Sequence, residues 1–329
     1  MTEATTPLTR ADPRACNETL LNYPPTASPK RLAVVGAGPA GLAYATVAAQ
    51  RGHRVSLFGS AAEIGGQFNL AKRIPGKEEF AETLRYYRRM IELHPIDWRP
   101  DTRADAALLV AEGFDAVVVA TGITPRRPAL PGIEHPMVMT YIDAILGRRA
   151  VGQRVAILGA GGIGFDVAEL VTHAGTSAAL DVDVFAREWG IDFKQHPRGG
   201  VTGVLPQVAK SGRTVVLMQR KADALGKNLG RTTGWTHRLT LTRRGVQMVS
   251  GVDYLKIDDT GLHTRVNGQP RLFAVDTVIV CAGQIPLRTL YDELAALGMP
   301  AHLVGGAFDA AELDAKRAID QASRLAAVV

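Results

Sequence analysis

The stretch LAVVGAGPAG, residues 32–41, decides the fold, because an apolar run ends there in a glycine-rich turn. The run predicts a buried strand, and the alanine-rich segment 42–50 predicts the helix that follows it. In this pattern Gly36 allows the tight turn, Gly38 lets the backbone approach a pyrophosphate, and Gly41 lets the helix pack on its strand. The N-terminal N–H groups of the helix then favour phosphate oxygens. The stretch therefore predicts a dinucleotide site.

The same pattern recurs in RVAILGAGGIG, residues 154–164, where Gly159, Gly161 and Gly164 repeat the spacing of the first turn. One such turn is a weak signal, whereas two strand–turn–helix units in one chain are a specific one. We therefore expect two bound dinucleotides. The fold class that follows is α/β, with two Rossmann-like domains whose parallel sheets are covered by helices in three layers.

Length and composition limit the class of protein. With 329 residues the chain can form two domains of ordinary size. It has no apolar run of the roughly 20 residues that span a bilayer, and its first residues lack the apolar stretch of a signal peptide. We therefore expect a cytoplasmic protein that does not bind a membrane.

Charge and cysteine content exclude further classes. The formal net charge of +6 comes from Lys and Arg spread along the chain, which suits nucleotide ligands but does not indicate nucleic acid. Cys16 and Cys281 form no ligand pattern, so we expect two free thiols, no disulfide and no metal site.

The end of the second strand in the first unit departs from the usual pattern. Segment 54–58 (RVSLF) predicts this strand, and Gly59 and Ser60 follow where an acidic residue commonly holds the ribose hydroxyls. Either Glu63 or a water takes that role, or nucleotide affinity is reduced. If one nucleotide is held weakly, we expect it to be the one at the first turn, and a gain of affinity in Gly59→Asp would support this.

In the second unit the corresponding strand, 214–219, is followed by Arg220 and Lys221. A basic pair at this place is what the 2′-phosphate of NADPH needs, whereas NADH needs an acid for its ribose. A solvated charge pair is the alternative. The position of the pair favours NADPH.

Other segments complete the coarse map. We expect an extended arm or linker over 1–30, an amphipathic helix over 77–93, a long insertion over 176–211, and antiparallel strands at 246–257 and 262–266. Apolar strands at 114–120 and 276–280 each end in a glycine-containing turn, and a helix is expected over 312–327.

Several motifs resemble one family of flavoprotein reductases. The segments EIGGQFN (63–69), IPGKEEF (74–80), EWGID (188–192), TTGW (232–235) and ELDA (312–315) are similar to the C-terminal half of bacterial NADPH-dependent 2,4-dienoyl-CoA reductases. The segment DPRACNE (12–18) is similar to the part that follows the iron–sulfur ligands in that family. The resemblance covers nearly everything after residue 30.

The sequence also departs from the family. The family has an N-terminal TIM barrel that holds FMN, and a four-cysteine cluster that connects the barrel to FAD; the barrel and the ligands have no counterpart here, and Cys16 matches the cysteine after them. The resemblance implies an NAD(P)H-binding domain, 146–269, inserted within an FAD-binding domain formed by 31–145 and 270–329.

The resemblance also implies site residues. For FAD they are Gly36, Gly38, Pro39, Ala40, Gly41, Ser60, Glu63, Gly66, Gln67, Thr121, Gly122, Gly283 and Gly306. For NADPH they are Gly159, Gly161, Gly162, Ile163, Gly164, Arg220 and Lys221. Asp166 stands where related flavoenzymes place a carboxylate near the nicotinamide, although a plain helix-surface acid is an equal reading. No residue is assigned a catalytic role beyond this candidate.

The function implied is hydride transfer from NADPH to FAD, with electrons passed to an acceptor outside the chain. In the family that acceptor is finally a 2,4-dienoyl-CoA in the β-oxidation of unsaturated fatty acids, reached through FMN and a 4Fe-4S cluster. Here these would belong to a missing N-terminal part or to a barrel protein supplied in trans. The alternatives are a stand-alone NADPH diaphorase with a small-molecule acceptor, a reductase subunit for another barrel protein, and a redox-inactive nucleotide-binding module.

Overall fold

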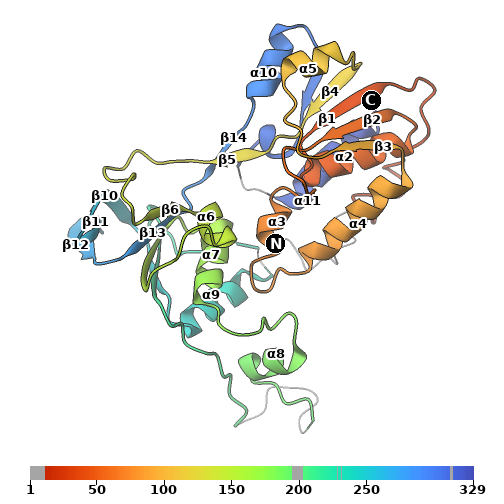
Figure 1. Cartoon of the computed structure of the whole chain (residues 1–329). Helices are drawn as coiled ribbons and strands as arrows, with labels where there is room; N and C mark the ends of the chain where they lie inside the picture. The colour runs from red at the N-terminus through yellow and green to blue at the C-terminus, as the bar shows by residue number, and fades with distance from the viewer. Residues whose placement is uncertain (1–11, 195–202, 228, 231, 312–313) are drawn as a thin grey trace. The chain divides into compact units, whose positions relative to one another are not determined.

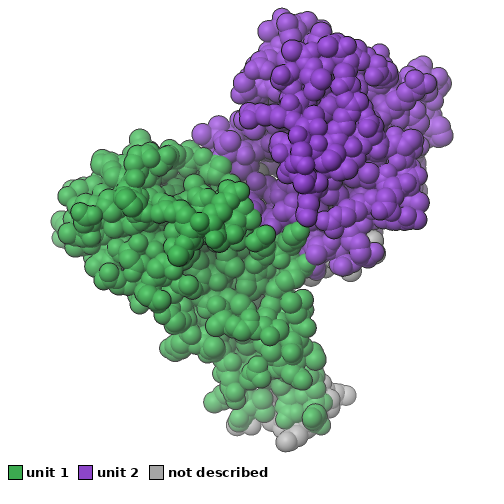
Figure 2. Space-filling view, in the orientation of Figure 1, with its two compact units in different colours: residues 1–4, 72–78, 125–283 green, residues 5–71, 79–124, 284–329 purple. Residues whose placement is uncertain are grey.

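The computed structural model describes residues 12–194, 203–227, 229–230, 232–311 and 314–329. The chain divides into two compact units, which Figure 2 colours separately. We call the first the outer unit; its described residues are 12–71, 79–124 and 284–329. The second, the inserted unit, contains residues 72–78 and 125–283.

The outer unit is built on a parallel sheet in the order β15-β4-β1-β2-β3. Its strands are β1 (Arg31–Val35), β2 (Arg54–Phe58), β3 (Ile96–Arg99), β4 (Ala116–Val119) and β15 (Ala301–Leu303). Helices cover both faces (Figure 1). They are α2 (Pro39–Gln50), α4 (Phe80–Leu93) and α11 (Ala315–Ala326) on one face, and α5 (Ala106–Ala111) and α10 (Thr289–Ala296) on the other.

The sequence of β1 explains these layers. Leu32 and Val34 pack with α2, α4 and α11, whereas Ala33 and Val35 pack with α5 and α10. Successive side chains of a strand point to opposite faces, so an uninterrupted apolar run requires cover on both sides. The short helix α3 (Phe68–Ala71) and the 3-10 turn η1 (Gly305–Ala307) complete this unit.

The inserted unit repeats this plan with a sheet in the order β6-β13-β7-β8-β9. Its strands are β6 (Val138–Thr140), β7 (Arg154–Leu158), β8 (Thr214–Met218), β9 (Gln247–Val249) and β13 (Thr277–Val280). The antiparallel strands β10 (Val252–Asp258), β11 (Gly261–Val266) and β12 (Gln269–Phe273) share a core with it. The helices are α6 (Tyr141–Leu146), α7 (Gly162–Thr172), α8 (Val182–Trp189) and α9 (Gly234–Arg243).

The structure confirms the α/β class with two Rossmann-like units, one inserted in the sequence of the other. The division differs from the predicted boundaries at 146 and 269, because β6 and β13 hydrogen-bond into the sheet of β7 and so belong to the inserted unit. The chain passes between the units next to β5 (Ile123–Pro125) and β14 (Gln284–Pro286), which pair with each other.

Four local predictions need correction. Segment 246–257 is two strands, since β9 joins the parallel sheet and only β10 is antiparallel. The insertion 176–211 contains helix α8, whose start is capped by the Asp181 carboxylate. The helix predicted from 77 begins at Phe80, because residues 74–77 form a turn in which Gly76 has φ of +88°. The predicted helix over 312–327 is found from Ala315, while 312–313 lie outside the described residues.

Within the described residues, no helix has the length and apolar character needed to cross a membrane. The same part of the chain contains no group of three or more His, Cys, Asp or Glu side chains placed to hold a metal ion. Cys16 and Cys281 are both free thiols.

Candidate functional site: two dinucleotide turns

The first glycine turn joins β1 to α2 in the outer unit. Gly36 has φ of +114°, and a Cβ atom there would lie 2.3 Å from the Ala120 carbonyl oxygen. A Cβ at Gly41 would lie 1.9 Å from the Gly36 carbonyl oxygen. Both positions therefore require glycine, one for conformation and both for space. The sequence pattern predicted this turn correctly.

The second turn joins β7 to α7 and has nearly the same geometry. Gly159 has φ of +110°, and its Cβ would lie 2.3 Å from the Cys281 carbonyl oxygen. A Cβ at Gly164 would lie 1.9 Å from the Gly159 carbonyl oxygen. The space next to Gly161 and Gly162 is open, because no described atom lies within 4 Å of the place that a Cβ would take at either residue.

Both turns leave the start of a helix open to an anion. The N-cap residues of α2 and α7 are Gly38 and Gly161, neither helix start is capped by a side chain, and neither first turn carries an acid. By contrast, carboxylates cap α5, α8 and α11. The uncapped N–H groups and the helix dipole are what a pyrophosphate requires.

Other predicted residues converge on the first turn. The Gly65 N–H donates to the Ala37 carbonyl at 2.7 Å, and a Cβ at Gly66 would lie 3.0 Å from the Gly38 Cα. A Cβ at Gly306 would approach the Gly122 carbonyl carbon to 3.3 Å. The remaining predicted residues of this group, Pro39, Ala40, Gln67 and Thr121, lie in the same turn or in these loops. The outer unit therefore gathers loops from four parts of the sequence beside one turn.

Gly283 is the exception. It lies in the inserted unit, where a Cβ would sit 3.0 Å from the Arg126 guanidinium, and Arg126 donates to the neighbouring Ala282 carbonyl. The residue follows β13, and the carbonyl of Cys281, just after that strand, packs on Gly159. Gly283 is thus the last residue of the inserted unit, directly before β14, and its role in FAD binding stays a prediction.

At the end of β2, Gly59 lies against the side chain of Trp98. A Cβ at Gly59 would lie 2.3 Å from Cη2 and 2.8 Å from Cζ3 of the Trp98 indole ring. An acidic side chain at this position therefore has no room. Ser60 is exposed, and the Glu63 side chain, 68% exposed, lies 3.8 Å from the Arg88 guanidinium. The structure gives a reason to expect no gain in FAD affinity from Gly59→Asp, because the Trp98 ring would have to move to make room for the new side chain.

At the end of β8, Arg220 and Lys221 are both exposed. Within the described residues neither side chain makes an ion pair or a hydrogen bond that would hold it away from a ligand. The pair follows Gln219, whose side-chain amide donates to the backbone carbonyls of Lys221 and Asp223 and so orders the loop. No carboxylate stands directly at the strand end, where one would repel a 2′-phosphate.

Asp166 proves to be an ion-paired residue. Lys77 Nζ donates to both carboxylate oxygens at 2.6 and 2.7 Å, and the Asp166 side chain is only 19% exposed. The Gly76 N–H also donates to the buried Ser177 hydroxyl at 3.1 Å, which holds the segment of Lys77 in the inserted unit. Neither reading of Asp166 included this pair, since the two residues lie 89 positions apart and no local pattern connects them.

Cys281 is buried directly after β13, where its carbonyl oxygen packs on Gly159 of the second turn. Burial raises the pKa of its thiol strongly, and the Asp166 charge raises it further. The thiol therefore stays protonated at neutral pH and is a packing residue beside the second turn.

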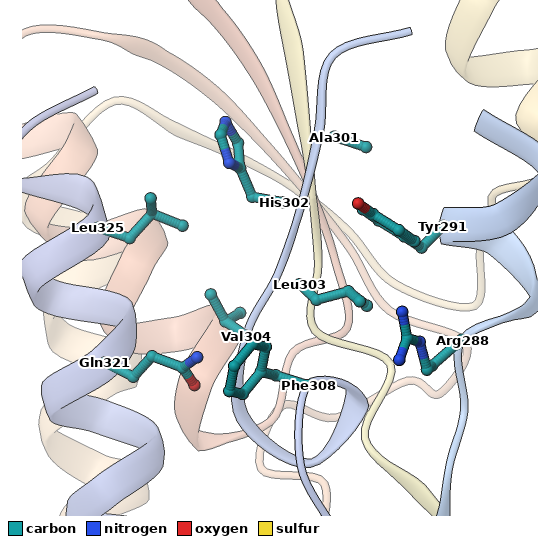
Figure 3. A pocket seen from close by; sticks show the side chains of 9 residues that line it. All are labelled: Arg288, Tyr291, Ala301, His302, Leu303, Val304, Phe308, Gln321 and Leu325. Carbon is teal, nitrogen blue, oxygen red and sulfur yellow. The ribbon is translucent and has the colours of Figure 1, made fainter. Parts of the chain in front are cut away.

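A cavity of about 380 Å³ also lies in the outer unit, along strand β15 (Figure 3). Tyr291 and Arg288 line it on one side and Gln321 and Leu325 on the other. Val304 and Phe308, which flank η1, close its lower end in this view. None of the predicted cofactor residues lines it, so the sites are identified here by the turns and not by this cavity.

Fold and turns together define a protein that binds two dinucleotides. Residues 30–304 match the model of the pyridine nucleotide-disulphide oxidoreductase family, and the chain belongs to this family. Membership implies one site for FAD and one for NAD(P)H. The residues present fit both groups, since each turn offers uncapped helix N–H groups and glycines that a side chain could not replace.

Several relatives are longer than this chain. A metal reductase of Desulforamulus reducens is 30% identical over 284 residues, which cover 85% of this chain and 41% of that protein. An NADH oxidase of Thermoanaerobacter brockii is 27% identical over 73% of this chain and 38% of its own length. The chain thus spans about two fifths of these relatives.

Among solved structures, a 2-naphthoyl-CoA reductase superimposes with a TM-score of 0.80 at 24% identity, over 97% of this chain and 43% of that one. Thioredoxin reductase of T. acidophilum superimposes with a TM-score of 0.60 at 15% identity, over 90% of this chain and 97% of that one. At these identities the likeness establishes the fold.

Proposed function

We propose that this chain is an NADPH-dependent flavoprotein reductase that binds FAD at the Gly36 turn and NADPH at the Gly159 turn. When bound, the two cofactors supply the chemistry, which is hydride transfer from the nicotinamide to the flavin and onward release of electrons. The preference for NADPH over NADH rests on Arg220 and Lys221, which are exposed at the end of β8 and have no partner among the described residues.

The assignment of the turns follows from the loops around them. The outer unit collects Gly65, Gly66, Gly122 and Gly306 near its turn, which suits a ligand as large as FAD. The inserted unit has the basic pair in place of an acid after its second strand, which suits a 2′-phosphate.

The chain's residues have three tasks in this proposal. The glycine turns and helix starts hold the pyrophosphates, and the basic pair selects the phosphorylated coenzyme. Lys77 neutralises Asp166, so that the helix that follows the second turn does not carry an unpaired negative charge toward the coenzyme. Hydride transfer needs no acid or base of its own, so these residues act by position and charge.

The final acceptor is a further part of the proposal. The motif resemblance to 2,4-dienoyl-CoA reductases points to a dienoyl-CoA, reached through an FMN and iron–sulfur barrel protein. The greater length of the relatives is compatible with such an additional part, either in the same polypeptide or in trans. A diaphorase that passes electrons to a small molecule is the runner-up.

Two assays test this proposal on the FAD-loaded chain. NADPH should support reduction of a dye acceptor, with a clear preference over NADH. Reduction of a 2,4-dienoyl-CoA should fail with the chain alone and appear when a barrel flavoprotein with an iron–sulfur cluster is added. Dye reduction without any such rescue would favour the diaphorase, and an inactive chain that binds both nucleotides would favour a redox-inactive module.

A further inference from the structure

A polar cavity of about 90 Å³ lies in the outer unit, and no residue of the Gly36 turn lines it. Its walls come from the arm, at residues 12–14 and Tyr23, and from helices α2, α4 and α11. None of the residues predicted for FAD or NADPH lines it. The proposed function leaves this cavity without a role.

Several residues that line this cavity carry a buried polar side-chain atom without a hydrogen-bond partner among the described residues. These atoms include Thr46 Oγ1 and Tyr87 OH, whose side chains belong to residues only 4% and 1% exposed, and Arg14 Nε. The Tyr23 and Ser323 hydroxyls also belong to residues of this wall and interact with each other. Buried polar groups are nearly always hydrogen-bonded, so the three unpartnered atoms at one cavity indicate a polar occupant.

The charge at the cavity selects the kind of occupant. The Arg14 guanidinium makes no ion pair within the described part of the chain and lies 5.4 Å from the centre of the Tyr23 ring. The Asp12 carboxylate, also in the wall, already accepts the Arg14 backbone N–H at 2.9 Å. Burial raises the pKa of both Tyr23 and Tyr87, so their phenols remain protonated and can donate. The wall therefore holds one cation, one carboxylate and several hydroxyl donors, and a polar occupant that accepts hydrogen bonds would contact Arg14 and the hydroxyls and lie away from Asp12.

The volume of the cavity limits which occupants can fit. A water needs about 10–15 Å³ of such volume, so the four oxygens of a tetrahedral anion need about 40–60 Å³. The cavity of about 90 Å³ therefore has room for one such anion and a water or two. It is too small for a nucleotide or an acyl chain.

We propose that this cavity binds a small tetrahedral oxyanion, phosphate or sulfate, through Arg14 and the hydroxyls of Thr46, Tyr87, Tyr23 and Ser323. The bound anion joins the arm to α2, α4 and α11. It thereby stabilises the attachment of residues 12–23 to the outer unit.

The test uses the full chain with saturating FAD and NADP⁺, so that both nucleotide turns are filled. Inorganic phosphate and sulfate are titrated separately by calorimetry in a chloride buffer, and the thermal midpoint is followed in parallel. We expect one saturable site for at least one of the anions and a midpoint that rises with its concentration. Arg14→Met should weaken binding at least tenfold, because it removes a charge-assisted donor.

Two further variants keep the test decisive if Arg14→Met perturbs the arm. Thr46→Val is close to isosteric and should weaken binding several-fold, whereas Arg85→Met removes an exposed, ion-paired arginine of α4 and should leave binding unchanged. Absence of saturable binding of either anion would mean that the cavity holds water only, which overturns the proposal. Binding that survives both Arg14→Met and Thr46→Val would place the anion elsewhere and overturn it equally.

Discussion

Replacing Gly59 by Ala is expected to destabilise the outer unit, although the backbone at this position suits any residue. Gly59 is absent from the glycines with positive φ, so an added Cβ meets no backbone strain. It would instead lie 2.3 Å from Cη2 of Trp98, more than 1 Å inside the usual contact distance of about 3.5 Å. Trp98 packs against the core beneath α2, so its ring must move out of this packing.

Overpacking of this kind costs about 1–3 kcal/mol, which exceeds the gain of about 0.4–1 kcal/mol that Gly→Ala gives by restricting the unfolded chain. Thermal unfolding should therefore show a lower midpoint for Gly59→Ala, and Trp98→Ala in the same chain should remove the additional loss. Gly212→Ala is the matched control, because no atom lies within 4 Å of its Cβ position and its φ is not positive. A Gly59→Ala midpoint equal to or above that of the wild type would refute the reasoning. For the same reason Gly59→Asp should not tighten FAD binding unless Trp98 is also removed.

Three further predictions concern charges of the inserted unit. Replacing Arg220 and Lys221 together by Ala should raise the KM for NADPH about 10- to 100-fold and leave that for NADH nearly unchanged in a dye assay; equal losses for both coenzymes would contradict a 2′-phosphate contact. Lys77→Met should lower the free energy of unfolding by about 1–2 kcal/mol, because it leaves the partly buried Asp166 carboxylate without its partner. Adding Asp166→Asn should recover most of this loss. If the losses of the two single variants simply add in the double variant, the pair does not interact. Partial burial raises the pKa of Asp276, but hydrogen bonds from the Arg154 and Gln153 backbone N–H groups and from the Thr277 and Arg154 side chains together outweigh it and lower the pKa overall. The ionised Asp276 carboxylate therefore stabilises the folded protein fully above the ordinary aspartate pKa of about 4, and this contribution is lost as the pH falls through the folded-state pKa. The difference in thermal unfolding midpoint between wild type and Asp276→Asn should shrink in acid and not in base.

The sequence was sufficient for features that depend on short stretches. Both glycine turns, strands β1, β2 and β7 and the buried strands β4 and β13 follow from apolar runs and from glycines within about ten residues of one another. The match between Gly36 and Gly159 in φ shows how completely a local pattern specifies such a turn.

Features that depend on distant residues could not be predicted in this way. Trp98 covers Gly59 because β3 pairs with β2, and Lys77 reaches Asp166 across 89 residues. The predicted FAD-binding domain includes residues 270–283, but the pairing of β13 with β7 places them in the inserted unit. Local propensity carries no information on which of two similar sheets a strand will join.

The central claim is that one chain holds FAD and accepts hydride from NADPH. The most direct measurement is the visible spectrum of the purified chain, loaded with FAD and kept free of oxygen, before and after addition of one equivalent of NADPH. We predict flavin absorbance at one FAD per chain and its bleaching by NADPH, with much slower bleaching by NADH. A chain that stays colourless in excess FAD, or a bound flavin that NADPH does not bleach, would contradict this account.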